Sequence, residues 1–308
     1  MPTPAAPAAP PLSKAQVFFR RLGSFVVLWT VILAALFSGV RWLSDSVFLL
    51  IMLGLAVAGL IEFYGIARKR ELFCFQAWGI VGGALLMGTT FLHCAGWLGP
   101  CQDPSRANDF ETPLLIIFVL GLCVRQFVSR SNTAGIVAIS VTLFGLMYVP
   151  WLLNFITKIN YFPGLAPGDG AFYVLYFILV TKFSDTGAYC VGSLIGRHKM
   201  IPRISPGKTW EGFGGAILGS VLVSLGFALF AGDRLQGMTP LHAVALGVIL
   251  GVGAVVGDLI ESLFKREAGL KDSGKLFPGI GGILDLLDSL LFNAPIMYLY
   301  LRHVLLAA

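Results

Sequence analysis

The chain has 308 residues, of which 56% are hydrophobic and only 12% are charged, and its formal net charge at pH 7 is +6. Soluble domains carry about 25% charged residues, so this composition excludes an ordinary soluble protein and indicates an integral membrane protein. Membrane topology and contact with anionic lipid headgroups explain the excess of basic residues, so we expect no nucleic-acid partner.

The chain opens with MPTPAAPAAPPLSKAQ, which is rich in alanine and proline and has too little apolar bulk to pack. We expect residues 1–20 to form a disordered tail. A membrane helix needs about 20 apolar residues, which predicts an all-α, polytopic membrane protein with about nine spans, five in residues 21–156 and four in the catalytic region, residues 157–308. The spans are centred near Ile32, Leu55, Leu86, Val119, Leu143, Ile178, Leu222, Leu250 and Met297.

Basic residues predict the orientation of these spans, because Lys and Arg accumulate in cytoplasmic loops. With a cytoplasmic N-terminus, the inner side receives Lys14, Arg20, Arg21, Arg68, Lys69, Arg70, Arg125, Arg130, Arg197, Lys199, Arg203, Lys208, Lys265, Arg266, Lys271 and Lys275. The outer side receives only Arg41, Arg106, Lys158, Arg234 and Arg302. This division predicts a cytoplasmic N-terminus and an outer C-terminus.

Charged residues within the spans are concentrated in the second half of the chain. The first five spans are nearly free of them, apart from Glu62 and Arg125. The last four spans carry Lys182, Asp185, Asp258, Glu261, Asp285 and Asp288. A carboxylate at the centre of a span costs roughly 2.5 to 3.5 kcal/mol on insertion scales, so something must compensate it, and we expect the functional site in this half.

A pair of carboxylates lies at the start of the last span, in GGILDLLDSLLFNAP. Asp285 and Asp288 are three residues apart and therefore share one helix face, a spacing suited to sharing a cation. Asp258 lies near the cytoplasmic end of the preceding span and could meet them. Oxygen ligands suit Mg²⁺, which commonly bridges substrate phosphates. In the alternative interpretation, Asp285 caps the last helix and Asp288 pairs with a lysine.

Two inner loops carry groups suited to phosphate. ESLFKREAGLKDSGKLFPGIGG combines clustered cations with glycines, although a solvated loop on the positive side would look the same. GRHKMIPRISPGKTWEGFGG offers hydroxyl and ammonium groups just before a helix that we expect to begin around Trp210, and helix N-termini favour anions. In TKFSDTGAYCVG, Lys182 and Asp185 could neutralise each other or reach the same polar cavity.

The run GDLIESLFKREAGLKDSGKLFPGIGGILDLLDS closely resembles the signature of the phosphatidate cytidylyltransferases, or CDP-diacylglycerol synthases. That signature is matched at Ser262, Lys265, Arg266, Lys271, Asp272, Asp285 and Asp288. SDTGAY, ISPGKTWEG and DSLLFNAP resemble further family segments, so the resemblance covers about residues 181–295. The chain departs from the pattern in two places, with Ile280 where the family usually has His and Leu286 where it usually has Arg.

The resemblance implies transfer of the cytidylyl group of CTP to phosphatidic acid, giving CDP-diacylglycerol and pyrophosphate. The lipid phosphate is already anionic and needs no strong general base, whereas bringing it onto a triphosphate requires metal ions and cations. The resemblance further implies Mg²⁺, with a second metal ion or a monovalent cation left open, and a homodimer among membrane lipids. We expect a bacterial inner membrane, because no transit peptide is seen.

The resemblance also gives roles to individual residues. The metal would be held by Asp258, Asp285 and Asp288. The nucleotide phosphates would be held by Ser205, Lys208 and Thr209. The lipid phosphate or the leaving pyrophosphate would be received by Lys265, Arg266 and Lys271. The roles of the missing His and Arg are dispensable, or Lys271 and Lys275 take over their phosphate contacts, or the activity is altered, and we favour the first two. The cavity would be lined by Lys182 and Asp185, and Asp272 would orient Lys271 or a water molecule.

Two other functions use the same residues. A related CTP-dependent polyprenol or phytol kinase would transfer the terminal phosphoryl group to an alcohol and release CDP. A cation-coupled transporter would bind a translocated ion at Asp258, Asp285 and Asp288. The basic clusters beside the carboxylates favour the nucleotide-dependent enzymes.

Overall fold

The structure is a computed structural model. It describes residues 23, 29–34, 36–37, 39–99, 104–129, 134–274 and 281–306, without the side chains of residues 104–107. The predicted tail, residues 1–20, and the positions Lys275 and Ile280 lie outside the described residues, and the predicted span around Ile32 is described only in part.

Helices dominate the described part of the chain. They are α2 (Arg41–Lys69), α3 (Gln76–Cys94), α4 (Pro104–Val128), α5 (Gly135–Leu146), α6 (Leu152–Asn160), α7 (Asp169–Ile195), α8 (Trp210–Ala231), α9 (Pro240–Glu267) and α10 (Ile283–Tyr300). The short elements are η1 (Met147–Trp151), β1 (Lys199–Ile201), β2 (Ser205–Thr209), η2 (Gly232–Arg234) and η3 (Leu301–Leu305). The two strands form an antiparallel hairpin in which Ile201 pairs with Ser205.

Within the described residues, eight helical segments are long and apolar enough to cross a membrane. They coincide with the last eight of the predicted spans, so the all-α, multi-pass class is confirmed. One span combines two helices: α5 and α6 are joined by the π-helical turn η1, which contains Pro150. Proline has no backbone N–H to donate, so the regular α-helical hydrogen bonding is interrupted here, and a single π-turn continues the helix.

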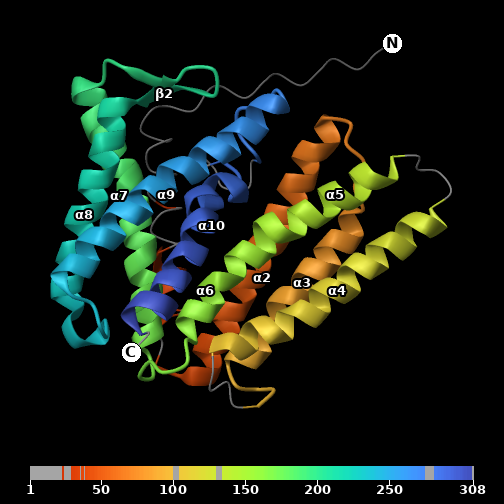
Figure 1. Ribbon diagram of the computed structural model, residues 1–308, viewed down its shortest axis with the longest axis horizontal. Helices are drawn as coiled ribbons and strands as arrows, with labels where there is room; N and C mark the ends of the chain where they lie inside the picture. Colours follow the sequence, from red (N-terminus) through yellow and green to blue (C-terminus); the bar gives the residue numbers. More distant parts are fainter. Residues whose placement is uncertain are drawn as a thin grey trace, which may run out of the picture.

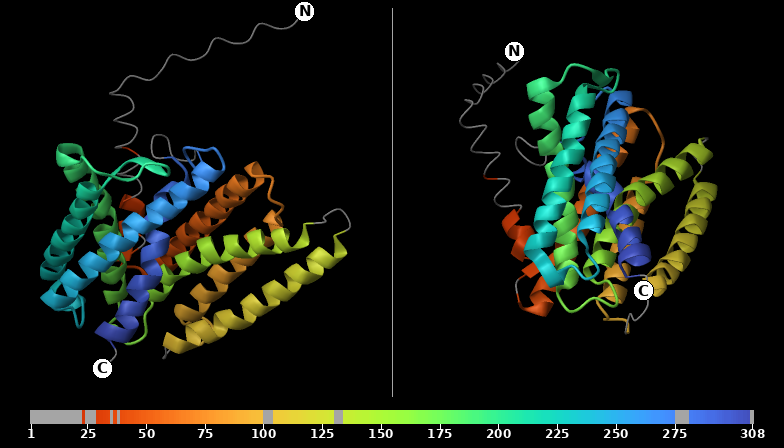
Figure 2. Two further views of the ribbon diagram at one scale, coloured as in Figure 1. Left: turned by 45° about the horizontal axis from the view of Figure 1, so that its top comes forward. Right: turned by 60° about the vertical axis from the view of Figure 1, so that its left-hand side comes forward.

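The helices form two groups with α10 between them (Figure 1). On one side α7 packs against α8 and α8 against α9, and on the other α2 packs against α3 and α3 against α4. Two further views show α8 and α4 on opposite flanks of the molecule (Figure 2). The α7–α8 contact is close because Gly187 lacks a side chain: a Cβ there would lie 2.3 Å from the carbonyl oxygen of Gly215.

Helix α10 has the largest buried share of the eight spans, because it contacts both groups of helices. Its buried Asn293 donates to Thr181 Oγ1 of α7 at 2.8 Å and to the Leu250 carbonyl of α9 at 2.9 Å. A polar side chain inside a membrane bundle holds helices together when it finds such partners. Any functional group on α10 is therefore fixed relative to α7 and α9.

A buried ion pair joins α6 to α4. Lys158 lies within α6, not in an outer loop, and its side chain is 1% exposed. Its Nζ is 2.7 Å from Glu111 Oε2 of α4, whose Oε1 also accepts from Asn154 Nδ2 at 2.7 Å and from Thr90 Oγ1 at 3.1 Å. Shared hydrogen bonds of this kind are what makes a buried charge pair tolerable.

Candidate active site

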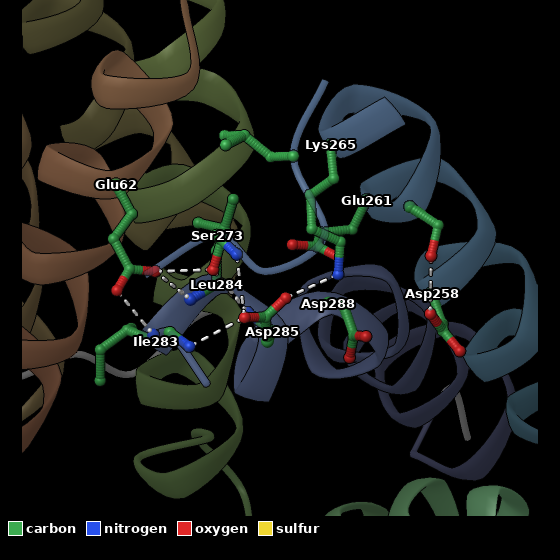
Figure 3. Close-up of polar contacts among 12 residues, drawn as sticks. Glu62, Asp258, Glu261, Lys265, Ser273, Ile283, Leu284, Asp285 and Asp288 are labelled. Atoms are coloured by element: carbon green, nitrogen blue, oxygen red, sulfur yellow. Dashed lines mark hydrogen bonds and ion pairs between the residues drawn. The ribbon is translucent and has the colours of Figure 1, made fainter. Parts of the chain in front are cut away.

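The candidate site lies where the C-terminal end of α9 meets the N-terminal end of α10. Three carboxylates lie at this junction, Glu261 from α9 and Asp285 and Asp288 from α10, and Asp258 of α9 lies apart from them (Figure 3). The two helices approach closely at Gly257, where a Cβ would lie 2.7 Å from the carbonyl oxygen of Asp288. The ends of α9 and α10 therefore meet, while the sharing of one cation by Asp258, Asp285 and Asp288 stays a prediction.

Asp285 is held by three donors. Its Oδ2 accepts the backbone N–H groups of Gly282 at 2.8 Å and Ser273 at 3.0 Å, and its Oδ1 accepts from Lys265 Nζ at 2.6 Å. The bond to Gly282 is a cap, because a carboxylate at the third helical position reaches back to the N–H that precedes the helix. The capping interpretation thus holds for one oxygen of Asp285, while the other faces an ammonium group.

Lys265 joins the two helices through a second carboxylate. Its ammonium group contacts Glu261 Oε2 as well as Asp285, and the Glu261 side chain is completely buried, at 0% exposure. Neither oxygen of Glu261 has a well-oriented hydrogen bond, so the ion pair is its compensation. Such a buried carboxylate requires a cation beside it.

Asp288 is buried and faces α7. Lys182 Nζ lies 3.9 Å from Asp288 Oδ1 and donates to the Leu286 carbonyl at 2.8 Å and to Ser289 Oγ at 3.2 Å. Lys182 is therefore directed at α10 rather than at Asp185 of its own helix. An ammonium group thus lies beside the backbone of Leu286, the position where the chain departs from the family pattern.

A cavity of about 450 Å³ opens beside Asp258, between α7, the hairpin, α8 and α9. Its lining includes Asp185, Lys208, Thr209 and Asp258. Lys208 Nζ is 2.8 Å from Asp258 Oδ2 and donates to the Val255 carbonyl at 3.3 Å. The predicted hydroxyl, ammonium and carboxylate groups from three segments of the sequence therefore reach one cavity.

Thr209 fixes the start of α8 at the edge of this cavity. Its Oγ1 accepts the backbone N–H of Gly212 at 3.1 Å, and α8 begins at Trp210, as predicted. An N-cap hydroxyl accepts one helix N–H and keeps its own O–H free to donate. Thr209 can therefore cap the helix and face an anion at the same time. Ser205, half-buried, lies at the other end of the same strand.

The remaining basic candidates are exposed. Arg266 Nε donates to the Ile204 carbonyl at 3.1 Å, which ties the hairpin to the end of α9. Lys271 and Asp272 lie exposed in the segment after α9. Across the described residues, neither of these two side chains hydrogen-bonds to or pairs with the four carboxylates. Their predicted contacts with phosphate or water stay predictions.

The carboxylates have the chemistry of a magnesium site, because they offer only oxygen ligands. Within the ranges that the structure describes, however, no group of three or more His, Cys, Asp and Glu side chains is close enough to hold a metal ion. Each predicted ligand instead has an ammonium neighbour: Lys208 for Asp258, Lys265 for Asp285 and Lys182 for Asp288. Mg²⁺ would fit the donor set if these lysines turned away from the carboxylates.

Two residues of the site carry no predicted role. Glu261 is the buried partner of Lys265, and Glu62 of α2 reaches the N-terminal end of α10 from the opposite side (Figure 3). The signal for both is the same: an ionisable side chain inside an apolar span is costly and needs a partner. Only the tertiary structure identifies that partner.

Similarity to known proteins extends over nearly the whole chain. Residues 24–304 match the model of the cytidylyltransferase family. The chain belongs to the cytidylyltransferase family. A relative from Chlamydia pneumoniae, named phosphatidate cytidylyltransferase, is 32% identical over 288 residues, 92% of this chain and 91% of that protein.

Two further relatives also match more than two thirds of the chain. A phosphatidate cytidylyltransferase of Mycobacterium leprae is 38% identical over 218 residues, 71% of this chain and 63% of that protein. YnbB of Escherichia coli K12, described as uncharacterized, is 31% identical over 287 residues, 89% of this chain and 85% of its own. The resemblance seen in residues 181–295 therefore extends into the first half of the chain.

Proposed function

We propose that this cytidylyltransferase family member transfers the cytidylyl group of CTP to phosphatidic acid, forming CDP-diacylglycerol and pyrophosphate. Family membership and the names of the relatives support the chemistry. The observation that carries the proposal within this chain is the cavity of about 450 Å³, where Lys208, Thr209 and Asp258 converge next to the junction of α9 and α10. A transporter would need neither the helix N-terminus nor the ammonium groups on one side of the carboxylates.

In the proposed reaction, an oxygen of the lipid phosphate attacks the α-phosphorus of CTP. A new P–O bond forms there while the bond from the α-phosphorus to the oxygen that bridges to the β-phosphorus breaks. Pyrophosphate leaves with that electron pair, and no proton has to be removed from the nucleophile. The protein must therefore supply position and positive charge rather than a strong base.

Lysines and hydroxyl groups would supply these interactions. Lys208, Thr209 and Ser205 would hold the nucleotide phosphates in the cavity, where the N-terminus of α8 favours negative charge. Lys265, with Arg266 and Lys271, would receive the lipid phosphate or the leaving pyrophosphate. Lys182 and Asp185 would form the wall of the cavity, and Asp272 would orient Lys271 or a water molecule.

Mg²⁺ belongs to the proposal, together with a possible second metal ion or monovalent cation. Asp258 and Asp285, assisted by Asp288, would hold it, and when bound it supplies positive charge against the triphosphate. The lysines that pair with these carboxylates would then be released to the phosphates. In this exchange Mg²⁺ would replace the lysines beside the carboxylates, and the lysines would pair with the phosphates, so that each charge keeps a partner of opposite sign.

The decisive experiment follows two labels of CTP. The purified protein is incubated with Mg²⁺, CTP labelled at either the α- or the γ-phosphorus, and phosphatidic acid or, in a parallel reaction, a polyprenol. We expect the α-label in the lipid product and the γ-label in pyrophosphate. A γ-label in a lipid, with release of CDP, would identify a kinase instead. Ion uptake into liposomes that is independent of nucleotide would favour the transporter.

Two variants test the carboxylates in the same assay. Asp285→Asn should abolish turnover while the protein stays folded. The matched control is Asp233→Asn, which changes an exposed aspartate in η2, the short helix between α8 and α9. Turnover retained by Asp285→Asn would remove the metal-binding role of Asp285.

We further propose a homodimer in a bacterial inner membrane, with the N-terminus and the nucleotide cavity on the cytoplasmic side. The segregation of basic residues between alternate loops supports this orientation. Cysteines introduced singly at Lys271 and at Asp233 test it, since a membrane-impermeant thiol reagent added to intact cells should label only the second. The reverse labelling would contradict the proposed orientation. A monomeric mass measured by light scattering would contradict the proposed homodimer.

A further inference from the structure

Glu62 of α2 reaches the N-terminal end of α10 with both carboxylate oxygens (Figure 3). Oε1 accepts the backbone N–H of Ile283 at 3.0 Å. Oε2 accepts the backbone N–H of Leu284 at 2.9 Å and the hydroxyl of Ser273 at 2.9 Å. We call Glu62 and these three partners the Glu62 cap. It joins a helix from the first half of the chain to the two segments that hold Asp285.

The Glu62 cap satisfies groups that the helix itself leaves unpaired. The first N–H groups of an α-helix have no partner within the helix, and the N-terminal end of its dipole is positive. A carboxylate from a neighbouring helix accepts hydrogen bonds from the unpaired N–H groups and places negative charge at the positive end of the dipole. The same N–H groups are the donors that a charged group inside a membrane protein requires. The partners of Glu62, deep within α2, therefore come largely from α10.

Ser273 connects the Glu62 cap to Asp285. Its backbone N–H donates to Asp285 Oδ2 at 3.0 Å, and its hydroxyl oxygen accepts the backbone N–H of Asp285 at 3.3 Å. The same hydroxyl donates to Glu62. Because Oδ2 is occupied in this way, Oδ1 is the oxygen that remains directed at Lys265. A change at Glu62 would therefore be transmitted to Asp285 through one serine.

Glycines allow the backbone to approach the Glu62 cap closely. A Cβ at Gly274 would lie 2.1 Å from Glu62 Oε1, and one at Gly282 would lie 2.4 Å from Oε2 and 2.2 Å from Ser273 Oγ. One turn before Glu62, a Cβ at Gly59 would lie 3.5 Å from Leu284 Cδ1 and 2.8 Å from Val149 Cγ1. Backbone and carboxylate are thus packed together around Glu62.

We propose that Glu62 is a positioning residue for cytidylyl transfer: it fixes Ser273 and the first turn of α10, so that Asp285 keeps Oδ1 available to Lys265 or to the proposed Mg²⁺. Helix α2 is then part of the active site, although it touches no substrate. This inference rests on the proposed function, because turnover is its main readout. A purely structural role for Glu62 would change stability but leave the turnover of folded protein intact.

Glu62→Gln tests the proposal, because one oxygen of the carboxylate becomes an NH₂ group that cannot accept a hydrogen bond. We expect kcat to fall about tenfold or more with KM for CTP changed less than about twofold, the pattern of an interaction that acts in the transition state. The matched control is Glu71→Gln, which changes an exposed glutamate just beyond the end of α2. It should leave kcat unchanged.

Variants of Ser273 provide a second, independent test of the same proposal. Ser273→Ala should lower kcat to a similar extent, whereas Ser273→Thr keeps the hydroxyl and should restore most of it. The double variant Glu62→Gln/Ser273→Ala should be no slower than the slower single variant, because residues in one hydrogen-bond network do not add. If Glu62→Gln does not fold, the two serine variants carry the test alone.

Three results would overturn the role of Glu62 while the wild type is active: an unchanged kcat in Glu62→Gln, an unchanged kcat in Ser273→Ala, or strictly multiplicative losses in the double variant. An inactive wild type in the same assay would instead overturn the proposed function. The two failures are therefore distinguishable.

Discussion

Replacing Lys265 by methionine separates the structural and the catalytic parts of the site. The ammonium group of Lys265 is the ion-pair partner of Glu261, which is 0% exposed, and it also lies 2.6 Å from Asp285 Oδ1. Methionine keeps the approximate length of the side chain and removes the charge. Glu261 would then be a buried carboxylate without a counter-charge, whereas Asp285 keeps its two backbone donors.

The expected cost follows from that difference. Breaking a buried ion pair by removing one partner destabilises proteins by about 3–5 kcal/mol, because the other charge stays buried and uncompensated. Most of this loss comes from Glu261, so the double variant Lys265→Met/Glu261→Gln should recover most of the stability. It should recover none of the turnover, since the ammonium group that we propose to bind phosphate is still missing.

Thermal unfolding in one detergent, followed by turnover with labelled CTP at a temperature where all variants are folded, measures both quantities. A Lys265→Met protein as stable as the wild type would refute the structural reasoning. A double variant that regains wild-type turnover would refute the catalytic role of Lys265. Glu267→Gln, at the exposed end of α9, is the control and should change neither quantity.

Three further predictions concern other parts of the molecule. Thr209→Val removes the cap of α8 and should cost about 1 kcal/mol of unfolding free energy and raise KM for CTP; unchanged values in a denaturation curve and in kinetics would contradict it. Lys158→Met leaves Glu111 buried without its cation and should cost about 3–5 kcal/mol, with partial recovery in Lys158→Met/Glu111→Gln and normal kcat of the folded protein. Chelation of divalent metal by EDTA should abolish turnover and added Mg²⁺ should restore it, so undiminished turnover in EDTA would exclude the metal from the reaction.

Hydropathy predicted the membrane spans because it depends only on neighbouring residues. The eight described spans and the start of α8 at Trp210 agree with the sequence for this reason. The interruption at Pro150 could be suspected from the proline alone, but the π-turn that continues the span depends on packing. The ends of spans and helices that depend on local chemistry could therefore be predicted from the sequence.

The hydrogen-bond and ion-pair partners of the charged residues could not be predicted from the sequence in the same way. Ser273 and Glu62 are 211 positions apart in the sequence, and nothing in the pattern around either residue indicates the other. Lys182 was as compatible with Asp185, three positions away, as with Asp288, which the fold brings to it. The sequence identified which residues need compensation, and the packing of α10 decided which partners provide it.

The position of α10 has a consequence for how the protein is made. This helix follows the other seven described spans along the chain, yet it lies between the two groups that they form. During synthesis, Glu62 of α2 enters the bilayer long before Ser273 and the first turn of α10, which supply its hydrogen-bond donors, are made. The contacts between the two groups of helices that run through α10, and the Glu62 cap with them, can therefore be completed only after the last described span has been inserted.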